Sequence, residues 1–599
     1  MSNAAVESTL KNMMEKEEVP STTTDAGTLL PVDASDATTA AATVTEDHPS
    51  PPDLTAQKRG LKVLFLSSDT GGGHRASAES LGKQFQLLFP GTTYDLLDVV
   101  EKDGVPPYNS LVRYYKHLSG HPSQWKLVYS VSNSRAFELL ADAHLKLMCE
   151  RAVRRSIQSY NPDVVVSVHP LMTNVPVLSC SKISQETGKH LPMFTVVTDL
   201  GSAHCLWFAN GVEKMFVGSE KVKELAMSRG KVPEEKLVLA GLPIRHDFAI
   251  QSENMGDRMS PEGIEYQRKV RQDLQLPYTD RKTILMMGGG EGVGSLGNMT
   301  DAIYVELVSQ GIDALVLVVC GRNEKLRAQL ETRDWNTVIQ RWRTAKDTNG
   351  YGSTLMSLSD ACGGSVVSAS GCDGPVTDQI RRMLVNGMTA TSNAVQFPTL
   401  ASGYTDKEDE KKADNVMNDL SIPIENSFVE TSKSVDNNNN NTPGGGSLVA
   451  SLEAKTGNVT VIGLGFIERM AEYMVAADIL VSKAGPGTIS EAASVSLPIM
   501  LTSFLPGQEE GNVNYVVDGG FGAYCPDNDP ISMAEELCLW LKDDNKLSLL
   551  SQAAKKFGSP YAARDIVKSI GESTLKWRDL NEEQQQQPAG STAAEVPKV

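Results

Sequence analysis

The sequence predicts an α/β protein with two Rossmann-like, doubly wound domains, and two observations support this. Short apolar runs alternate with helical patterns from Leu61 onward, and the same alternation begins again near Lys282. In each half, the first apolar run leads into a glycine-rich stretch, "GGGH" at 71–74 and "GGGEGVG" at 288–294. Alternation of this kind is typical of parallel sheets that are covered by helices on both faces.

Taken in chain order, the apolar runs predict six strands in each half. Those of the first half are expected at 62–67, 94–98, 163–168, 193–197, 214–217 and 237–240. Those of the second half are expected at 283–287, 314–319, 459–462, 479–482, 498–501 and 521–524. The segment "AGLPIRHDF" at 240–248 resembles an exit from the first half.

Polar, low-complexity segments flank and interrupt these halves. Residues 1–57, which are acidic, and residues 579–599 have little to bury and are predicted to be disordered. Between 332 and 456 the alternation breaks down, and the run "VDNNNNNTPGGGS" predicts an inserted low-complexity segment. The predicted domains are therefore 58–250 and, around the insertion, 251–331 with 457–578.

Composition narrows the class of protein. The 599 residues carry a net charge of −18, which disfavours nucleic acid as a partner. None of the eight cysteines forms a CxxC pair, so zinc and disulfide scaffolds are not expected. No apolar run approaches the roughly 20 residues of a membrane span. The acidic first 50 residues contain no recognisable signal or transit peptide.

The first glycine-rich motif, "GGGHRA", lies between a predicted strand and a predicted helix. Glycines let the backbone approach a ligand, and a helix start offers unpaired N–H donors. The motif can also be parsed as GxGxxA with Asp98 ending the next strand, which is close to a dinucleotide fingerprint. A glycine turn without a ligand is the third interpretation, and the bulky ring of His74 argues against the dinucleotide.

Two loops of the second half have the chemistry of a nucleotide-sugar site. "SKAGPGTISEA" at 482–492 opens a helix toward a phosphate, and Glu491 could accept ribose hydroxyls or merely complement the helix dipole. "LPGQEEGN" at 505–512 carries the amide and carboxylate groups that read sugar hydroxyls, although a solvated loop would have the same composition.

In these motifs and several others, the chain resembles the plant-type monogalactosyldiacylglycerol (MGDG) synthases. The matching motifs occur in family order over 61–331 and 457–578: "LSSDTGGGHRASAE", "VVSVHPLM", "VVTDLGSAHCLWF", "GLPIR", "MGGGEGVG", "VVCGRNEKL", "SKAGPGTISEA" and "GQEEGNV". The resemblance implies a GT-B fold and a relationship to the bacterial lipid II-forming N-acetylglucosaminyltransferase. It implies the transfer of galactose from UDP-galactose to 1,2-diacylglycerol with inversion, in galactolipid biosynthesis.

The resemblance assigns roles to individual residues. His74 lies at the catalytic centre, and its imidazole is the preferred base because its ordinary pKa is close to working pH; the carboxylate of Asp199 is the alternative. Arg245 is expected to face the nucleotide, Glu491 the ribose and Phe466 the uracil. The other expected UDP-sugar residues are Gly73, Gly289, Gly290, Gly485, Pro486, Gly487, Thr488, Gln508, Glu509 and Asn512. No cofactor or metal is expected, since no acidic DxD-type site is evident.

The resemblance also implies a peripheral membrane protein of the plastid envelope, because diacylglycerol stays in the bilayer. The expected contact face is 108–129, where aromatic rings suit the headgroup boundary and cations suit anionic lipids. A pair of core helices with inward-facing tyrosines is the alternative. The acceptor-side and membrane-side candidates are Arg113, Lys116, Trp125, Trp207 and Phe208.

The chain departs from the family in two places, and other functions stay open. The segment 102–126 lacks the usual tryptophan–proline pair, and the insertion at 332–456 is foreign to the family pattern. A UDP-glucose-dependent diacylglycerol glucosyltransferase would differ only in the donor. A nicotinamide-dependent oxidoreductase would bind NAD in place of UDP, and a non-catalytic nucleotide-sugar sensor would not require His74.

Overall fold

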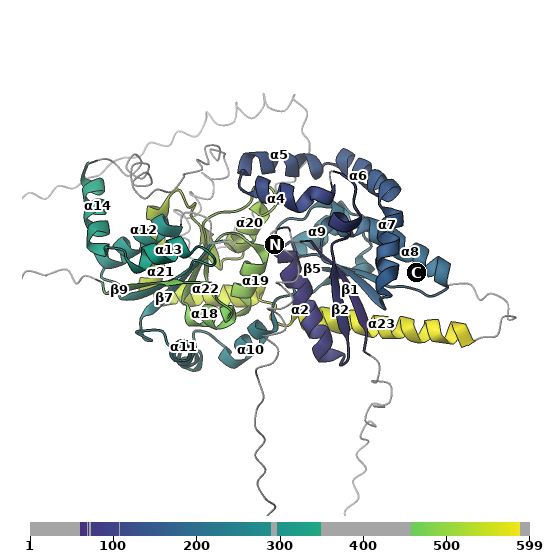
Figure 1. The fold of residues 1–599 in the computed structure, drawn as a ribbon. Helices are drawn as coiled ribbons and strands as arrows, with labels where there is room; N and C mark the ends of the chain where they lie inside the picture. Colours follow the sequence, from purple (N-terminus) through teal and green to yellow (C-terminus); the bar gives the residue numbers. More distant parts are fainter. Residues whose placement is uncertain are drawn as a thin grey trace, which may run out of the picture. The chain divides into compact units, whose positions relative to one another are not determined.

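The structure is a computed structural model, and it describes residues 60–348 and 457–586 without 69, 71–72, 107 and 289–295. These residues form two six-stranded parallel sheets with helices on both faces (Figure 1). Every predicted strand is present, and its ends lie within two residues of the predicted ones. The predicted pair of Rossmann-like, doubly wound domains is therefore confirmed.

The first sheet has the strand order β2-β1-β3-β4-β5-β6. Its strands are β1 (Lys62–Leu66), β2 (Thr93–Leu97), β3 (Val164–Ser167), β4 (Met193–Val196), β5 (Met215–Val217) and β6 (Leu237–Leu239). The connecting helices are α2 (Gly73–Leu88), α3 (Val99–Asp103), α4 (Leu111–Ser119), α5 (Pro122–Ser132), α6 (Arg135–Met148), α7 (Glu150–Tyr160), α8 (Asn174–Thr187) and α9 (Glu220–Ser228). β3 and β4 are buried along their whole length, as expected of central parallel strands.

The second sheet has the order β12-β11-β10-β7-β8-β9. Its strands are β7 (Lys282–Met287), β8 (Ala314–Val319), β9 (Val459–Leu464), β10 (Ile479–Ser482), β11 (Ile499–Leu501) and β12 (Gly522–Tyr524). Its helices are α10 (His246–Met255), α11 (Pro261–Asp273), α12 (Leu296–Ser309), α13 (Glu324–Glu331), α14 (Trp335–Thr348), α18 (Met470–Ala476), α19 (Pro486–Ser494), α20 (Glu510–Asp518), α21 (Pro530–Lys542) and α22 (Asp544–Phe557). β8 pairs with β9 across the insertion, from Ala314 opposite Val459 onward.

Two of the domain boundaries in the structure differ from those predicted from the sequence. Helix α14 lies beyond the expected domain end at residue 331, and Trp335 packs on the second core and stacks on Tyr304 with ring centroids 4.2 Å apart. The last helix, α23 (Ala562–Gln586), continues into the predicted disordered tail. The rest of the insertion and of both ends lies outside the described residues.

Helix α23 also packs on a different domain from the one predicted. Its apolar stripe, formed by Ala563, Ile566, Val567 and Ile570, is buried with β1, β3 and α2 in the core of the first sheet. The spacing of these four residues places them on one face of a helix. Residues 562–578, assigned from the sequence to the second domain, therefore complete the first.

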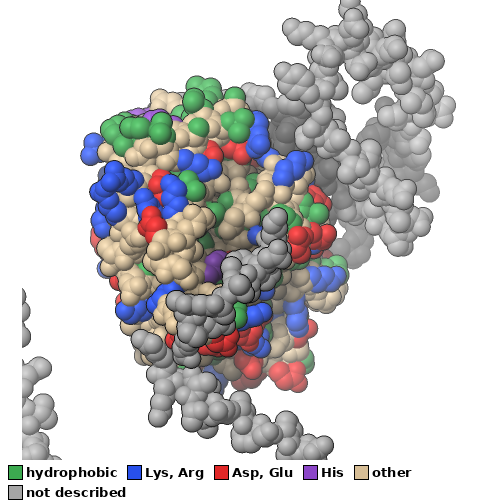
Figure 2. Space-filling model, turned by 90° about the vertical axis from the view of Figure 1, so that its right-hand side faces the viewer, with side chains coloured by type: hydrophobic (Ala, Val, Ile, Leu, Met, Phe, Trp, Pro, Cys, Tyr) green, Lys and Arg blue, Asp and Glu red, His purple; other side chains and the backbone are tan. Residues whose placement is uncertain are grey.

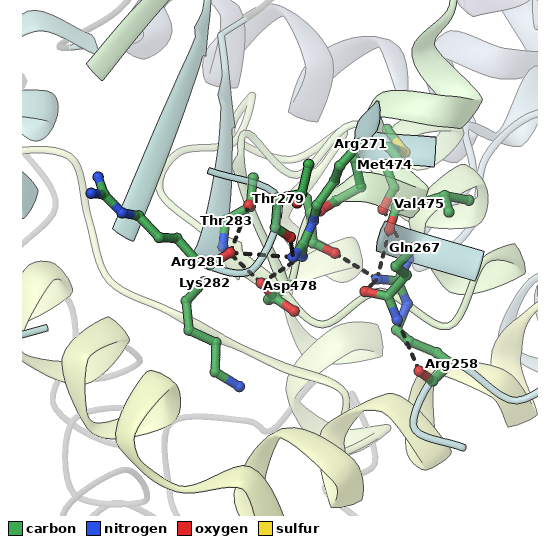
Figure 3. A network of polar contacts seen from close by, with 12 residues as sticks. Arg258, Gln267, Arg271, Thr279, Arg281, Lys282, Thr283, Met474, Val475 and Asp478 are labelled. Atoms are coloured by element: carbon green, nitrogen blue, oxygen red, sulfur yellow. Dashed lines mark hydrogen bonds and ion pairs between the residues drawn. The ribbon is translucent and has the colours of Figure 1, made fainter. Parts of the chain in front are cut away.

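Two buried arginines fix the helices on either side of β10 (Figure 3). Arg258 donates from Nη2 to the Met474 carbonyl at the end of α18, and from Nε to the Val495 carbonyl at the end of α19, both at 2.9 Å. Arg271 donates to the Ala476 carbonyl at 2.7 Å. Cations at these helix ends satisfy orphan carbonyls and complement the helix dipoles. The two helices that flank β10 and the following loop in the sequence are therefore held in place.

Candidate active site

The loop that joins β10 to α19 has the geometry predicted for a diphosphate site. Gly485 precedes the helix as its N-cap residue and has no side chain to cap the first N–H groups, and Pro486 is the first helical residue. Among the residues that the structure describes, none would come within 4 Å of a Cβ added at Gly487. A helix start with free N–H donors and a partial positive charge suits an anion. Thr488 lies in the same turn and is half-buried.

Arg245 and Glu491, predicted separately, form an ion pair. Nε and Nη2 of Arg245 donate to Oε1 of Glu491 at 3.0 and 2.8 Å. Burial raises the pKa of Glu491, and the neighbouring guanidinium opposes that rise. The pair brings the start of α10 against α19. The sequence offered no signal for this contact, because the two residues are 246 positions apart.

Glu509 is held by protein groups through both of its oxygens. Oε1 pairs with Nζ of Lys483 at 2.6 Å, and Oε2 accepts from the backbone N–H of Leu505 at 2.9 Å. Lys483 was missed from the sequence, although it stands in the "SKAGPGT" motif beside Gly485. Gln508 differs from its neighbour, since its Oε1 is buried and lacks a hydrogen-bond partner within the described residues.

Asn512 joins the loop 505–512 to the first domain. Its Oδ1 accepts from the N–H of Gly201 at 2.7 Å, and its Nδ2 donates to the carbonyl of Ala484 at 2.9 Å. Ser202 donates from Oγ to the Gln508 carbonyl at 2.7 Å. The predicted sugar-facing residues therefore meet the first domain next to Asp199.

His74 and Asp199 lie near each other around Trp207. Nδ1 of His74 lies 2.8 Å from Oγ1 of Thr198, and the ring of His74 lies 5.9 Å from that of Trp207. Nε1 of Trp207 donates to Oδ2 of Asp199 at 2.6 Å. The ring of His169 lies 4.8 Å from that of His74, in an edge-on contact. The two candidate bases therefore lie in one buried cluster, and which of them acts in the reaction stays a prediction.

Burial sets the protonation of this cluster. Desolvation lowers the pKa of His74 to about 4, and a hydrogen bond to the backbone of Val168 opposes this. Desolvation also lowers the pKa of His204 to about 4 and that of His169 well below its ordinary value. It raises the pKa of Asp199 to about 6, against the hydrogen bond from Trp207. At neutral pH the imidazoles are unprotonated and Asp199 is mostly ionised.

The remaining donor-side predictions have mixed outcomes. Gly73 is the first residue of α2, directly before His74, and an added Cβ there would meet nothing within 4 Å. Phe466 lies in the loop after β9 and is 72% exposed, so its ring is free to stack on a base. Gly289 and Gly290 lie outside the described residues.

The expected membrane face is only partly exposed. Trp125 packs on Tyr115 and Tyr129 with ring centroids 5.3 and 6.2 Å away, and Tyr129 packs on His204 at 5.4 Å. Arg113 and Lys116 are exposed. The packing of these three rings on one another and on His204 agrees with the inward alternative, and a lipid contact of the exposed cations stays a prediction.

Trp207 and Phe208, the other membrane-side candidates, are buried. They therefore offer no surface to a membrane in this structure, since the indole N–H donates to Asp199 and Phe208 packs in the core behind β5, while an acceptor-side role of Trp207 stays a prediction.

A metal site and a membrane-spanning helix were both sought in the described ranges 60–348 and 457–586 with their gaps. There, no three His, Cys, Asp or Glu side chains are placed to hold a metal ion, and the metal-free reaction stays a prediction. Within the same residues, no helix is long and apolar enough to cross a membrane.

Comparison with known proteins agrees with the motifs. Residues 74–244 match the family model "Monogalactosyldiacylglycerol (MGDG) synthase", and residues 431–566 match "Glycosyltransferase family 28 C-terminal domain". A protein of Oryza sativa subsp. indica named probable monogalactosyldiacylglycerol synthase 2, chloroplastic, is 29% identical over 85% of this chain and 80% of its own. Monogalactosyldiacylglycerol synthase 1, chloroplastic, of Arabidopsis thaliana is 27% identical over 87% and 73%.

Among solved structures, MurG of Acinetobacter baumannii aligns with 86% of this chain and 99% of its own at 13% identity, with a TM-score of 0.43. That likeness is too distant to add to the sheet topology described above. The two family models reach strands of both sheets and include His74, Asp199 and the loop before α19. The chain therefore resembles the plant monogalactosyldiacylglycerol synthases over most of its length, as its motifs predicted.

Proposed function

We propose that this protein transfers galactose from UDP-galactose to 1,2-diacylglycerol with inversion and so forms monogalactosyldiacylglycerol. One observation carries the proposal. The buried His74–Asp199 cluster of the MGDG-synthase-like half lies beside the Asn512 contact, which ties Gly201 of the first domain to the donor loop (residues 483–485, between β10 and α19) of the second. A candidate base lies on one side of this contact, and a helix start that suits a diphosphate lies on the other. A sugar transfer needs both groups.

In the proposed reaction, a lipid hydroxyl attacks the anomeric carbon of galactose from the face opposite the diphosphate. The C1–O bond to the lipid forms as the C1–O bond to UDP breaks, and the hydroxyl proton passes to Nε2 or Nδ1 of His74. The free N–H groups of α19 and the guanidinium of Arg245 stabilise the charge that develops on UDP. A single displacement gives a β-galactoside.

Asp199 is the second candidate for the base, and its environment favours it. Its pKa of about 6 lies closer to working pH than the pKa of about 4 of His74, and catalysis by a base is most efficient near that match. In that case the neutral imidazole of His74 would orient the acceptor hydroxyl.

Diacylglycerol lies in a membrane, so the protein needs a surface that binds lipid. Helices α5 and α6 provide such a surface. Hydrophobic side chains gather along the upper edge of the face in Figure 2, at the height of α5 and α6 in Figure 1. The exposed apolar residues of these helices are Leu127, Val128, Val131, Leu139, Leu140, Leu147 and Met148. An apolar surface of this kind is typical of a protein that docks on lipid. Because the named relatives are chloroplastic, we propose the plastid envelope as the place of action.

The decisive experiment is a transfer assay with purified full-length protein, vesicles that contain diacylglycerol, and UDP-galactose or UDP-glucose in parallel. We expect a monogalactosyl lipid by mass spectrometry, with a β-anomeric signal by NMR, and the same rate in excess EDTA. A glucolipid as the main product would make the protein a glucosyltransferase. An absence of lipid product together with NAD binding would overturn the proposal.

A further inference from the structure

The side chain of Asn512 uses both of its polar ends to hold two chain segments together. Its oxygen accepts from Gly201 of the first domain, and its amide nitrogen donates to the carbonyl of Ala484 of the second. Asn512 is only 2% exposed. An amide that is committed at both ends has one orientation, and turning toward a sugar hydroxyl would break a buried hydrogen bond.

The backbones around this side chain are in direct contact. A Cβ added at Gly201 would overlap the carbonyl group of Gly511, and a Cβ added at Gly511 would overlap the carbonyl group of Gly201. Only glycine at both positions permits this approach. Ser202 adds a hydrogen bond to the Gln508 carbonyl at 2.7 Å. The contact is therefore built from Gly201 and Ser202 of the first domain and from Gln508, Gly511 and Asn512 of the second.

The segments that Asn512 joins are those that carry the proposed chemistry. Gly201 follows Asp199 by two residues, and Ala484 directly precedes Gly485 at the start of α19. A sugar transfer requires the attacking oxygen and the anomeric carbon to come within about 3–3.5 Å. The distance between the Asp199 turn and the donor loop decides whether that approach occurs.

We infer that Asn512 is a positioning residue that fixes the separation between the Asp199 turn and the donor loop, in place of the sugar-reading role that the sequence predicted. The inference rests on the proposed transfer. It leaves Gln508, whose buried Oε1 has no partner in the described part of the chain, as the polar group of the loop 505–512 that is free for the sugar.

The test compares Asn512→Ala with Gly201→Ala, which perturbs the same contact from the first domain. We expect each to lower kcat by about 10- to 100-fold, since a 1 Å misplacement can cost that much. The loss should be equal for UDP-galactose and UDP-glucose. The calorimetric Kd values for UDP and UDP-galactose should stay within twofold of wild type. The double variant should be no slower than the slower single variant, because both remove one shared contact.

Ser202→Ala keeps the test decisive if either variant melts early, since it removes only the hydrogen bond to Gln508; it should lower kcat by a smaller factor. Gly297→Ala in α12 is the matched control, because the nearest described atom to its added Cβ is 3.7 Å away, and it should retain wild-type kcat. The inference is overturned if Asn512→Ala loses affinity for UDP-galactose but not for UDP while Gly201→Ala does not. Product formation by the wild-type protein tests the proposed function separately.

Discussion

The reactivity of His74 follows from where its ring lies. The ring is enclosed by Thr198, His169 and Trp207, and it keeps a pKa of about 4 because water cannot solvate its charged form. An imidazole in that state is always ready to accept a proton, but it holds the proton weakly. Asp199 is placed in the same cluster with the opposite shift.

We expect His74→Ala to lower the transfer rate by about 10²–10⁴, the usual contribution of a general base. UDP affinity should be unchanged, because the donor loop belongs to the other domain. Initial rates and calorimetry on the same preparation would measure both quantities. Equal loss of turnover and of UDP affinity would mean that His74 supports the fold instead of the reaction. His117→Ala on the exposed part of α4 is the matched control.

The pH dependence of kcat/KM should identify the base. A base must be unprotonated, so activity falls as pH drops below its pKa. If Asp199 is the base, kcat/KM should fall about tenfold per pH unit below about 6, and if His74 is the base it should stay level down to about 4. We expect the wild-type protein to show the limb near pH 4, because the proposed reaction uses His74 and Oδ2 of Asp199 already accepts from Trp207, and we expect the same limb in Asp199→Asn. A limb near 6 that disappears in Asp199→Asn would assign the base to Asp199.

At the scale of elements, α5 has two different faces. One face carries Tyr129, whose ring lies against His204 and above Gly507 of the donor-side loop. Another carries exposed aliphatic residues such as Leu127, which continue onto α6. A lipid surface on the outer face would therefore be separated from the site by the thickness of one helix.

We expect Leu139→Ser combined with Leu140→Ser to weaken co-sedimentation with uncharged vesicles by at least tenfold. These side chains are 58% and 70% exposed, and burial of a leucine contributes about 1.5–3 kcal/mol. Leu549→Ser, at a position 65% exposed on α22, is the matched control. Charge reversal of Arg113, Lys116 and Lys126 should act only on anionic vesicles and fade with salt. Unaltered sedimentation of both variants would place the lipid contact elsewhere, and a dimer lost in the leucine variant would make this face a subunit interface.

At the scale of the whole molecule, the insertion interrupts the chain without interrupting the sheet. β8 and β9 pair over their full length, from Ala314–Val459 to Val319–Leu464. The first part of the insertion is tied down, since Arg333 pairs with Asp301 and Trp335 stacks on Tyr304. The boundary for any shortened protein therefore lies after α14.

We expect removal of residues 360–445 to leave the transfer rate and the melting temperature close to those of the full chain. The reason is that all strands, α14 and the site residues are retained. Removal of 332–456 is the informative comparison, because it also deletes Trp335 from the second core and should lower the melting temperature. A stable but inactive 360–445 deletion would show that this segment takes part in the reaction.

The sequence by itself determined the strands, the donor loop and the family resemblance. Each of these is a property of a short stretch of sequence. An apolar run forms a buried strand whichever element packs on it, and "AGPGT" opens a helix toward an anion wherever that helix packs. The fold class could be predicted for the same reason, because two consecutive series of alternating strands and helices have few ways to form parallel sheets.

Only the tertiary structure decided which polar groups form hydrogen bonds and ion pairs with one another. Arg245 and Glu491 are 246 residues apart, and Gly201 and Asn512 are 311 apart, so no spacing within the sequence could pair them. The same holds for Trp125, whose aromatic character suits a headgroup boundary and a buried wall equally well, and for α23, whose apolar stripe fits either sheet. Periodicity states that a face is buried, and only the packed chain determines what buries it.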